Sequence, residues 1–120
     1  MVLATRLLPF LAGLFCAAGV ALAAAASHGG DAHLLGNASL MCLVHAPTLL
    51  VLSMLAERRK TAFYAAWPIA AGTALFALDL LSRHYRGEGL FPMAAPSGGM
   101  LMIAGWLVLA VWSLVPDRNR

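Results

Sequence analysis

Asp79 is the charged residue of this sequence that lies inside a predicted helix rather than at a helix end or in a connection. If that helix crosses a membrane, a carboxylate at its centre is disfavoured by about 2.5–3.5 kcal/mol, and by less near the surface. Arg83 follows at i+4 on the same helix face, so an Asp79–Arg83 ion pair is available. Three roles remain open for Asp79: a locally paired structural carboxylate, a proton or ion relay, and a contact between subunits.

Histidine side chains are the second group that could do chemistry. His45 shares a helical stripe with Asn37, Met41 and Thr48, which makes that face the more polar one. The other histidines lie at or beside the predicted connections: His28, His33 and His84. Imidazoles and a carboxylate on adjacent helices can bind a metal ion or pass protons, which makes His28, His45 and Asp79 the candidate ligands.

Other interpretations of these residues stay open. The histidine spacings match no known ligand motif, and a histidine inside a membrane also serves as a hydrogen-bond link between helices. Cys16 and Cys42 fall in apolar stretches, where two inert thiols are the usual finding. The sequence contains no zinc-ligand spacing, phosphate loop or nucleophile elbow. We therefore expect no catalytic residues, no resident metal and no cofactor.

The elements that must position these residues follow from the composition. Of the 120 residues, 62% are hydrophobic and 11% are charged, against about 45–50% and 25% in soluble domains. Uncharged stretches cover residues 7–30, 32–56, 61–78 and 89–116. Each holds roughly the 20 apolar residues with which a helix crosses a ~30 Å hydrocarbon core. This pattern excludes a soluble enzyme, a nucleic-acid-binding domain and a disordered tail.

The predicted architecture is all-α: a single domain, residues 1–120, that forms an integral-membrane antiparallel four-helix bundle. The helices are expected at about 6–27, 37–57, 61–83 and 93–115. The connections contain Gly and charged residues and are short, so each helix should pack beside its sequence neighbour.

The first stretch imitates a secretory signal peptide, with Arg6 before an apolar core and an Ala-rich segment after it. Its uncharged run is long for such a core, which spans about 7–15 residues. We therefore interpret it as a retained transmembrane helix.

Lys and Arg residues predict the orientation. Two basic residues lie on one side of the predicted membrane, Arg83 and Arg86. Six lie on the other: Arg6, Arg58, Arg59, Lys60, Arg118 and Arg120. This excess predicts a multi-pass inner-membrane protein with both termini in the cytoplasm. Interfacial aromatic residues are expected on the same side: Tyr64, Trp67 and Trp112.

Small residues are expected to mediate helix packing, because lipid provides no hydrophobic drive between helices. Gly13 and Ala17, and Gly19 and Ala23, have the small-xxx-small spacing on the first helix. On the fourth helix Gly98, Gly105 and Trp112 recur every seven residues. These positions could pack within the bundle or against a partner, and both interpretations stay open.

Several short motifs together suggest a family. The first helix ends in Ser27-His28-Gly29, and the second contains His45-Ala46 followed by Leu49-Leu50. The third contains Leu75-Phe76. The fourth contains Pro96-Ser97-Gly98-Gly99 and, later, Gly105-Trp106. In order and spacing, over nearly the whole chain, these residues resemble a family of small membrane proteins known as domain of unknown function 423, which includes transmembrane protein 256.

The resemblance implies a four-helix inner-membrane protein and supplies no reaction. It marks six positions as packing or helix-linking residues: His28, His45, Pro96, Gly98, Gly99 and Trp106. The sequence departs from the family pattern in the segment 37–42, which replaces an aromatic and Tyr-Gln segment before the second-helix histidine. It also departs at Asp79, where the family has a small residue.

From the sequence we expect a non-enzymatic membrane protein that serves as an accessory or structural subunit. Its partners would be the lipid bilayer and other membrane-protein subunits or further copies of itself, and not nucleic acid. One alternative is a small transporter or proton-linked channel that uses Asp79 and His45. Another is a metal- or haem-binding membrane subunit.

Overall fold

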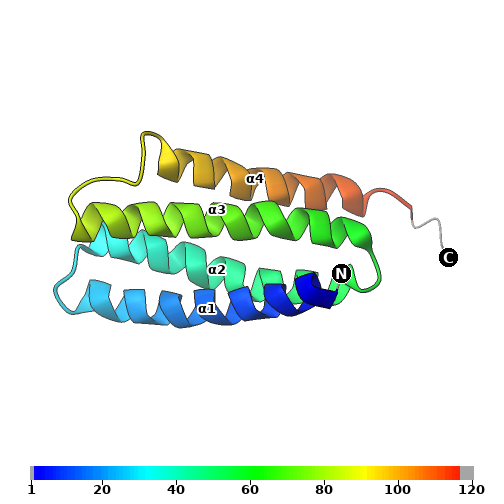
Figure 1. The fold of residues 1–120 in the computed structure, drawn as a ribbon, viewed down its shortest axis with the longest axis horizontal. Coiled ribbons are helices and arrows are strands. Elements are labelled where there is room, and N and C mark those ends of the chain that lie inside the picture. The colour runs from blue at the N-terminus through cyan, green and yellow to red at the C-terminus, as the bar shows by residue number, and fades with distance from the viewer. Residues whose placement is uncertain (1, 117–120) are drawn as a thin grey trace.

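The structure is a computed structural model that describes residues 2–116, with side chains from Thr5 onward. The described residues form four helices: α1 (Val2–Ser27), α2 (Ala32–Ala56), α3 (Lys60–Tyr85) and α4 (Ala94–Ser113). All four are long and apolar enough to cross a membrane. Successive helices run antiparallel, so the α1–α2 turn and the α3–α4 connection share one end of the molecule (Figure 1). The predicted all-α antiparallel bundle is confirmed.

The second helix begins five residues before the predicted start at 37, at Ala32. Asp31 caps it, because its side chain accepts hydrogen bonds from the backbone N–H groups of His33, at 2.9 Å, and Leu34, at 3.0 Å. A side-chain acceptor at the N-cap satisfies N–H groups that the first turn leaves unpaired. The predicted start was wrong because this cap lies at Asp31, and Gly36 is tolerated inside the first turns at about 1 kcal/mol.

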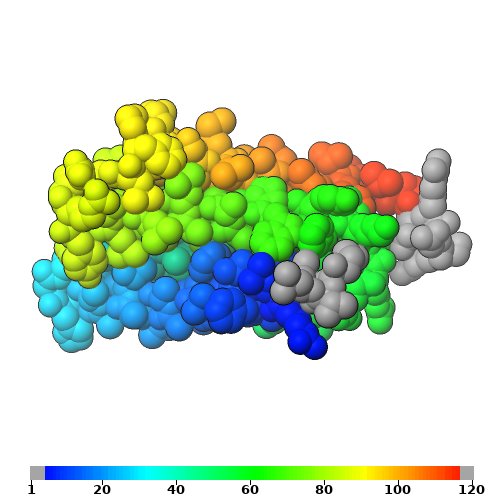
Figure 2. All heavy atoms as spheres, viewed as in Figure 1, coloured from blue at the N-terminus to red at the C-terminus, as the bar shows by residue number. Residues whose placement is uncertain are grey.

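The helices pack in chain order: α1 along α2, α2 along α3, and α3 along α4. The central pair α2 and α3 is therefore flanked by α1 and α4, which form opposite edges of the body in the space-filling view (Figure 2). One core cluster lies toward the α2–α3 turn and includes Leu8, Leu49 and Ile69. A second cluster lies toward the other end and includes Leu35 and Leu80.

The flanking helices expose the largest share of their surface, and most of it is apolar. The large exposed side chains of α4 include Met100, Ile103, Leu107 and Val111. A helix that is apolar on its outer face is suited to lipid rather than to water. The chain is therefore a multi-pass membrane protein.

Candidate functional site

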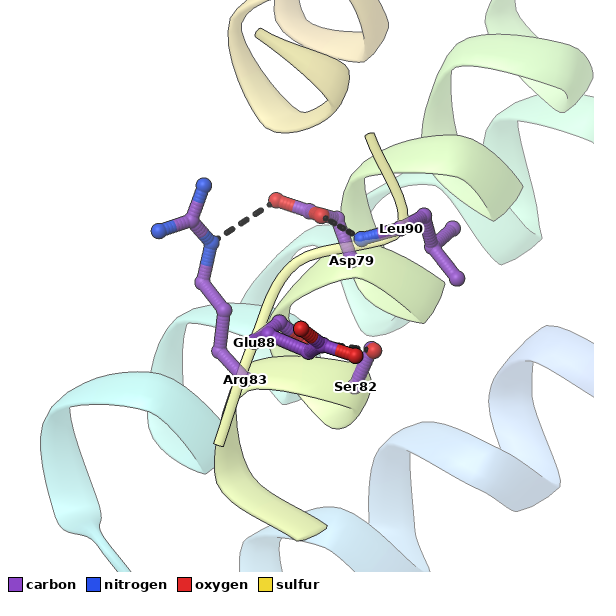
Figure 3. Close-up of polar contacts among 5 residues, drawn as sticks. All are labelled: Asp79, Ser82, Arg83, Glu88 and Leu90. Carbon is purple, nitrogen blue, oxygen red and sulfur yellow. Dashed lines mark hydrogen bonds and ion pairs between the residues drawn. The ribbon is translucent and has the colours of Figure 1, made fainter. Parts of the chain in front are cut away.

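Asp79 is fully buried near the end of α3. Its Oδ2 accepts a hydrogen bond from Nε of Arg83 at 2.9 Å, which forms the ion pair that the i+4 spacing makes available. Its Oδ1 accepts a hydrogen bond from the backbone N–H of Leu90 at 2.8 Å, in the α3–α4 connection (Figure 3). Asp79 thus joins α3 to the α3–α4 connection.

The connection approaches Asp79 closely because Gly89 has no side chain. A Cβ at this position would lie 2.7 Å from Oδ1 of Asp79, inside van der Waals contact. The Oγ of Ser82 donates a hydrogen bond to the carbonyl oxygen of Glu88 at 2.7 Å, which ties the preceding residue to α3 (Figure 3). The i+4 spacing predicted the Arg83 partner of Asp79 but not the Leu90 partner. The one sequence signal for the second contact was Gly89 beside Leu90, since a glycine allows the backbone to approach closely.

The surroundings of Asp79 suit a structural role. The carboxylate is inaccessible, whereas 46% of the Arg83 side chain is exposed, so the guanidinium reaches the surface while its Nε stays on Asp79. Both carboxylate oxygens accept hydrogen bonds, from one cation and from the connection. A buried charge is tolerated when it is paired and hydrogen-bonded in this way. The second ion pair nearby, Arg86 with Glu88, is exposed on both sides.

His45 links α2 to α4 across the width of the bundle. Its Nε2 accepts a hydrogen bond from Nε1 of Trp106 at 3.1 Å, and its Nδ1 lies 2.8 Å from the carbonyl oxygen of Met41. An indole N–H only donates and a carbonyl only accepts, so the two contacts fit an imidazole with its proton on Nδ1 and a lone pair on Nε2. Both ring nitrogens are therefore engaged. A metal ion or a second proton on Nε2 would displace the Trp106 hydrogen bond.

The structure does not bring the three candidate metal ligands together. His28 is exposed at the end of α1, while His45 and Asp79 are bonded to separate partners. Within residues 2–116, no three His, Cys, Asp or Glu side chains gather in a set that could hold a metal ion. Of the other two histidines, His33 is exposed beside the Asp31 cap, and the ring of His84 packs edge-on against Tyr85 with centroids 4.6 Å apart.

Two glycines of α4 bring its backbone into contact with α3. A Cβ on Gly98 would lie 2.7 Å from the carbonyl oxygen of Gly72, and a Cβ on Gly105 would lie 2.9 Å from that of Ala65. A Cβ on Gly72 of α3 would likewise lie 2.5 Å from the carbonyl oxygen of Gly98. Small residues allow such close approach in membranes, where packing replaces the hydrophobic effect. These two α4 glycines therefore belong to packing within the bundle.

The remaining small residues divide between the bundle and the surface. Gly19 is buried against α2, where a Cβ would lie 2.6 Å from Cγ of Leu43. Gly13, Ala17 and Ala23 are exposed, and the space beside Gly13 is empty within 4 Å. Gly99 is half-buried, also with nothing within 4 Å of a Cβ. Of the two α1 motifs, the Gly13–Ala17 pair faces outward.

Asp31 is the acidic residue of the α1–α2 turn, outside the membrane-spanning helices. The backbone N–H of Leu34 and then that of His33 stabilise its charged form, which lowers the pKa of Asp31 below its ordinary value of 3.8. The positive charges that His33 and His84 can carry act in the same direction. The cap is therefore ionised, and most effective, at neutral pH.

Fold and polar contacts together define a small multi-pass membrane protein whose buried polar residues link helices. The chain belongs to the family described as protein of unknown function (DUF423), whose model matches residues 13–99. The match contains His28, His45, Asp79 and the Pro96–Gly99 segment and ends before Trp106. No curated protein and no solved structure matches the chain. The family predicted from the motifs is confirmed.

Proposed function

We propose that the chain is a non-enzymatic accessory subunit that associates with another membrane protein through the exposed face of α1. The observation that carries this proposal is a stripe of small residues on that face. We call it the α1 stripe, and it consists of Gly13, Ala17, Ala21 and Ala24. These residues are spaced by four, four and three, so they lie on one side of the helix.

The α1 stripe consists of small residues, and the exposed large side chains of Phe10, Leu14 and Val20 lie beside it on the same helix. The outer faces of α2 and α4 present large side chains such as Met54, Met100 and Ile103, which suit contact with lipid chains. A stripe of Gly and Ala instead lets a second helix backbone approach closely, and such surfaces drive helix association in membranes. Nothing lies within 4 Å of a Cβ at Gly13, so the position is open to a partner helix.

The polar residues support a structural rather than a chemical role. In the part of the chain that the structure describes, every buried side-chain nitrogen or oxygen has a hydrogen-bond partner. His45 and Asp79 each join elements that are distant in sequence. A proton carrier must exchange its partners, whereas these contacts stabilise the arrangement of α2, α3 and α4.

We further propose that the protein lies in the inner membrane with both termini in the cytoplasm. The basic segment Arg58–Lys60 lies at the same end of the bundle as the start of α1 and the end of α4 (Figure 1). An excess of Lys and Arg marks the cytoplasmic side of membrane proteins. Two further basic residues of that count, Arg118 and Arg120, lie outside the described residues.

The test is purification from native membranes in mild detergent, followed by mass determination and identification of co-purifying proteins. Wild type is expected to elute with another membrane protein, and Gly13→Leu with Ala17→Leu should release it. The control is Ala110→Leu, which makes the same change on the exposed face of α4. A wild-type particle that is strictly monomeric, or a double variant that retains its partner, would contradict the proposal.

Oxidative cross-linking separates a foreign partner from a second copy of the chain. Cys16 is exposed on α1 between Gly13 and Ala17 in the sequence, whereas Cys42 is buried. In a homodimer built on the α1 stripe, the double variant Ala17→Cys with Cys16→Ser places two thiols at the contact and forms a disulfide-linked dimer. With a foreign partner, this dimer is absent while co-purification persists.

A further inference from the structure

A cationic hollow of about 400 Å³ lies at the end of the bundle that carries the α2–α3 turn. It lies between that turn, the first turn of α3 and the end of α4. The residues that line it and carry the argument are Arg58, Arg59, Lys60, Thr61, Trp112 and Val115. We call this space the basic pocket. It is well separated from Asp79, which lies toward the opposite end of α3.

The basic pocket is electropositive. Residues 57–61 contain three cations and one carboxylate, that of Glu57, which gives the segment a net charge of +2. The first turn of α3 contains no acidic residue, and no side chain caps it, so the positive end of the helix dipole adds to this charge. Arg59 lies over the indole ring of Trp112, with Cζ 5.0 Å from the ring centroid, which holds its guanidinium at the pocket.

The basic pocket continues into an apolar groove on α4. The groove has a volume of about 450 Å³ and is lined by Leu107, Val108, Val111, Trp112 and Val115. Trp112 and Val115 line both spaces. From Trp112 to Leu107 the groove follows α4 for about 7–8 Å into the membrane-spanning region, at 1.5 Å per residue. A ligand that fills both spaces must have an anionic head and a hydrocarbon tail.

We propose that this end of the protein binds an anionic phospholipid, with its phosphate in the basic pocket and one acyl chain along the α4 groove. Guanidinium, ammonium and hydroxyl donors, from Arg58, Arg59, Lys60 and Thr61, are the groups that bind phosphate oxygens in proteins. Basic pockets at the membrane boundary recognise anionic lipid headgroups in this way. A free anion would occupy only the basic pocket, and no part of it would fill the α4 groove.

The test uses quenching of Trp112 fluorescence in nanodiscs made mostly of phosphatidylcholine. A minor fraction of the lipid carries brominated chains, either on phosphatidylglycerol or on phosphatidylcholine at the same mole fraction. The Trp112 signal is obtained as the difference from the Trp112→Phe variant. Bound brominated phosphatidylglycerol should quench Trp112 more strongly than brominated phosphatidylcholine, and equal quenching overturns the proposal.

Charge variants locate the headgroup. Arg58→Gln with Lys60→Gln should lower the preference for phosphatidylglycerol about twenty-five-fold, because each cation near an anionic headgroup contributes a factor of about five. Arg86→Gln removes a cation from the opposite end of the bundle and should leave the preference unchanged. Helical circular dichroism verifies that each variant is folded. Equal losses in the two variants would mean a general charge effect and would overturn the site.

Competition with inorganic phosphate separates a lipid from a free anion. A phospholipid anchored by its acyl chain keeps quenching Trp112 when phosphate is added at matched ionic strength. Loss of the quenching under these conditions would show that the basic pocket binds phosphate alone, and the lipid assignment would be wrong. Quenching that persists in the double charge variant would overturn the assignment of the headgroup to this pocket.

Discussion

The Asp79 cluster permits a quantitative prediction, in which Asp79→Ala is the perturbation. The substitution leaves the backbone N–H of Leu90 without its acceptor and Arg83 without its partner. Losing a hydrogen bond to a charged group destabilises the fold by about 1.5–3 kcal/mol. The ion pair adds about 0–1 kcal/mol, because 46% of the Arg83 side chain is exposed and can be solvated. We expect a total loss of about 1.5–4 kcal/mol.

Asp79→Asn is the matched comparison. The amide keeps an oxygen for the Leu90 N–H and loses the charge that pairs with Arg83. Its cost should therefore be smaller, about 1 kcal/mol, with the helix connection still in place. Glu88→Ala serves as a control for charge, because it removes the exposed pair with Arg86 and should change stability by less than about 0.5 kcal/mol.

The assay is equilibrium unfolding in mixed micelles of mild detergent and dodecyl sulfate, followed by helical circular dichroism. Hydrogen exchange at the Leu90 amide gives the local readout. Exchange should accelerate in Asp79→Ala and change little in Asp79→Asn. Two results would refute the reasoning: equal destabilisation by the two substitutions, or an unchanged Leu90 exchange rate in Asp79→Ala.

Three further predictions address the helix contacts and the Asp31 cap. Gly98→Ala should destabilise the bundle by about 1–3 kcal/mol in the same micelle unfolding assay, because the new Cβ meets backbone atoms of α3. Gly99→Ala is the control: nothing lies within 4 Å of its new Cβ, so the substitution should be neutral or stabilising. Trp106→Phe leaves Nε2 of His45 without its donor and should cost about 1–3 kcal/mol; a thermal midpoint equal to that of wild type would contradict the link. Asp31→Ala should lower the thermal midpoint at neutral pH. Because the pKa of Asp31 is lowered in the folded state, the stabilisation is present above pH 3.8 and is lost as the pH falls through the folded value, so the two midpoints should converge in acid.

The α1 stripe and the basic pocket point to different kinds of contact. The stripe lies on the outer face of one flanking helix, and the pocket lies at the end of the other. A partner helix on α1 and a lipid on α4 would therefore occupy opposite edges of the bundle (Figure 2). The two proposals can fail independently, because the variants that test one leave the residues of the other unchanged.

The sequence by itself determined the spans, because a helix that crosses hydrocarbon needs a long uncharged run that composition reveals directly. It also determined the Asp79–Arg83 pair, since i and i+4 meet on any helix. The family motifs were visible for the same reason: they are local patterns. The start of α2 was predicted incorrectly, because the Asp31 cap depends on how the turn folds rather than on periodicity.

Tertiary structure decided the contacts between residues that are distant in sequence. His45 and Trp106 are 61 positions apart, and Asp79 and Leu90 are 11 apart across a turn, so no helical periodicity pairs them. Packing also decided which glycines face a neighbour: Gly98 contacts α3, whereas Gly13 faces outward. An all-round apolar helix carries little information about which face it buries, because lipid and protein interior are both apolar.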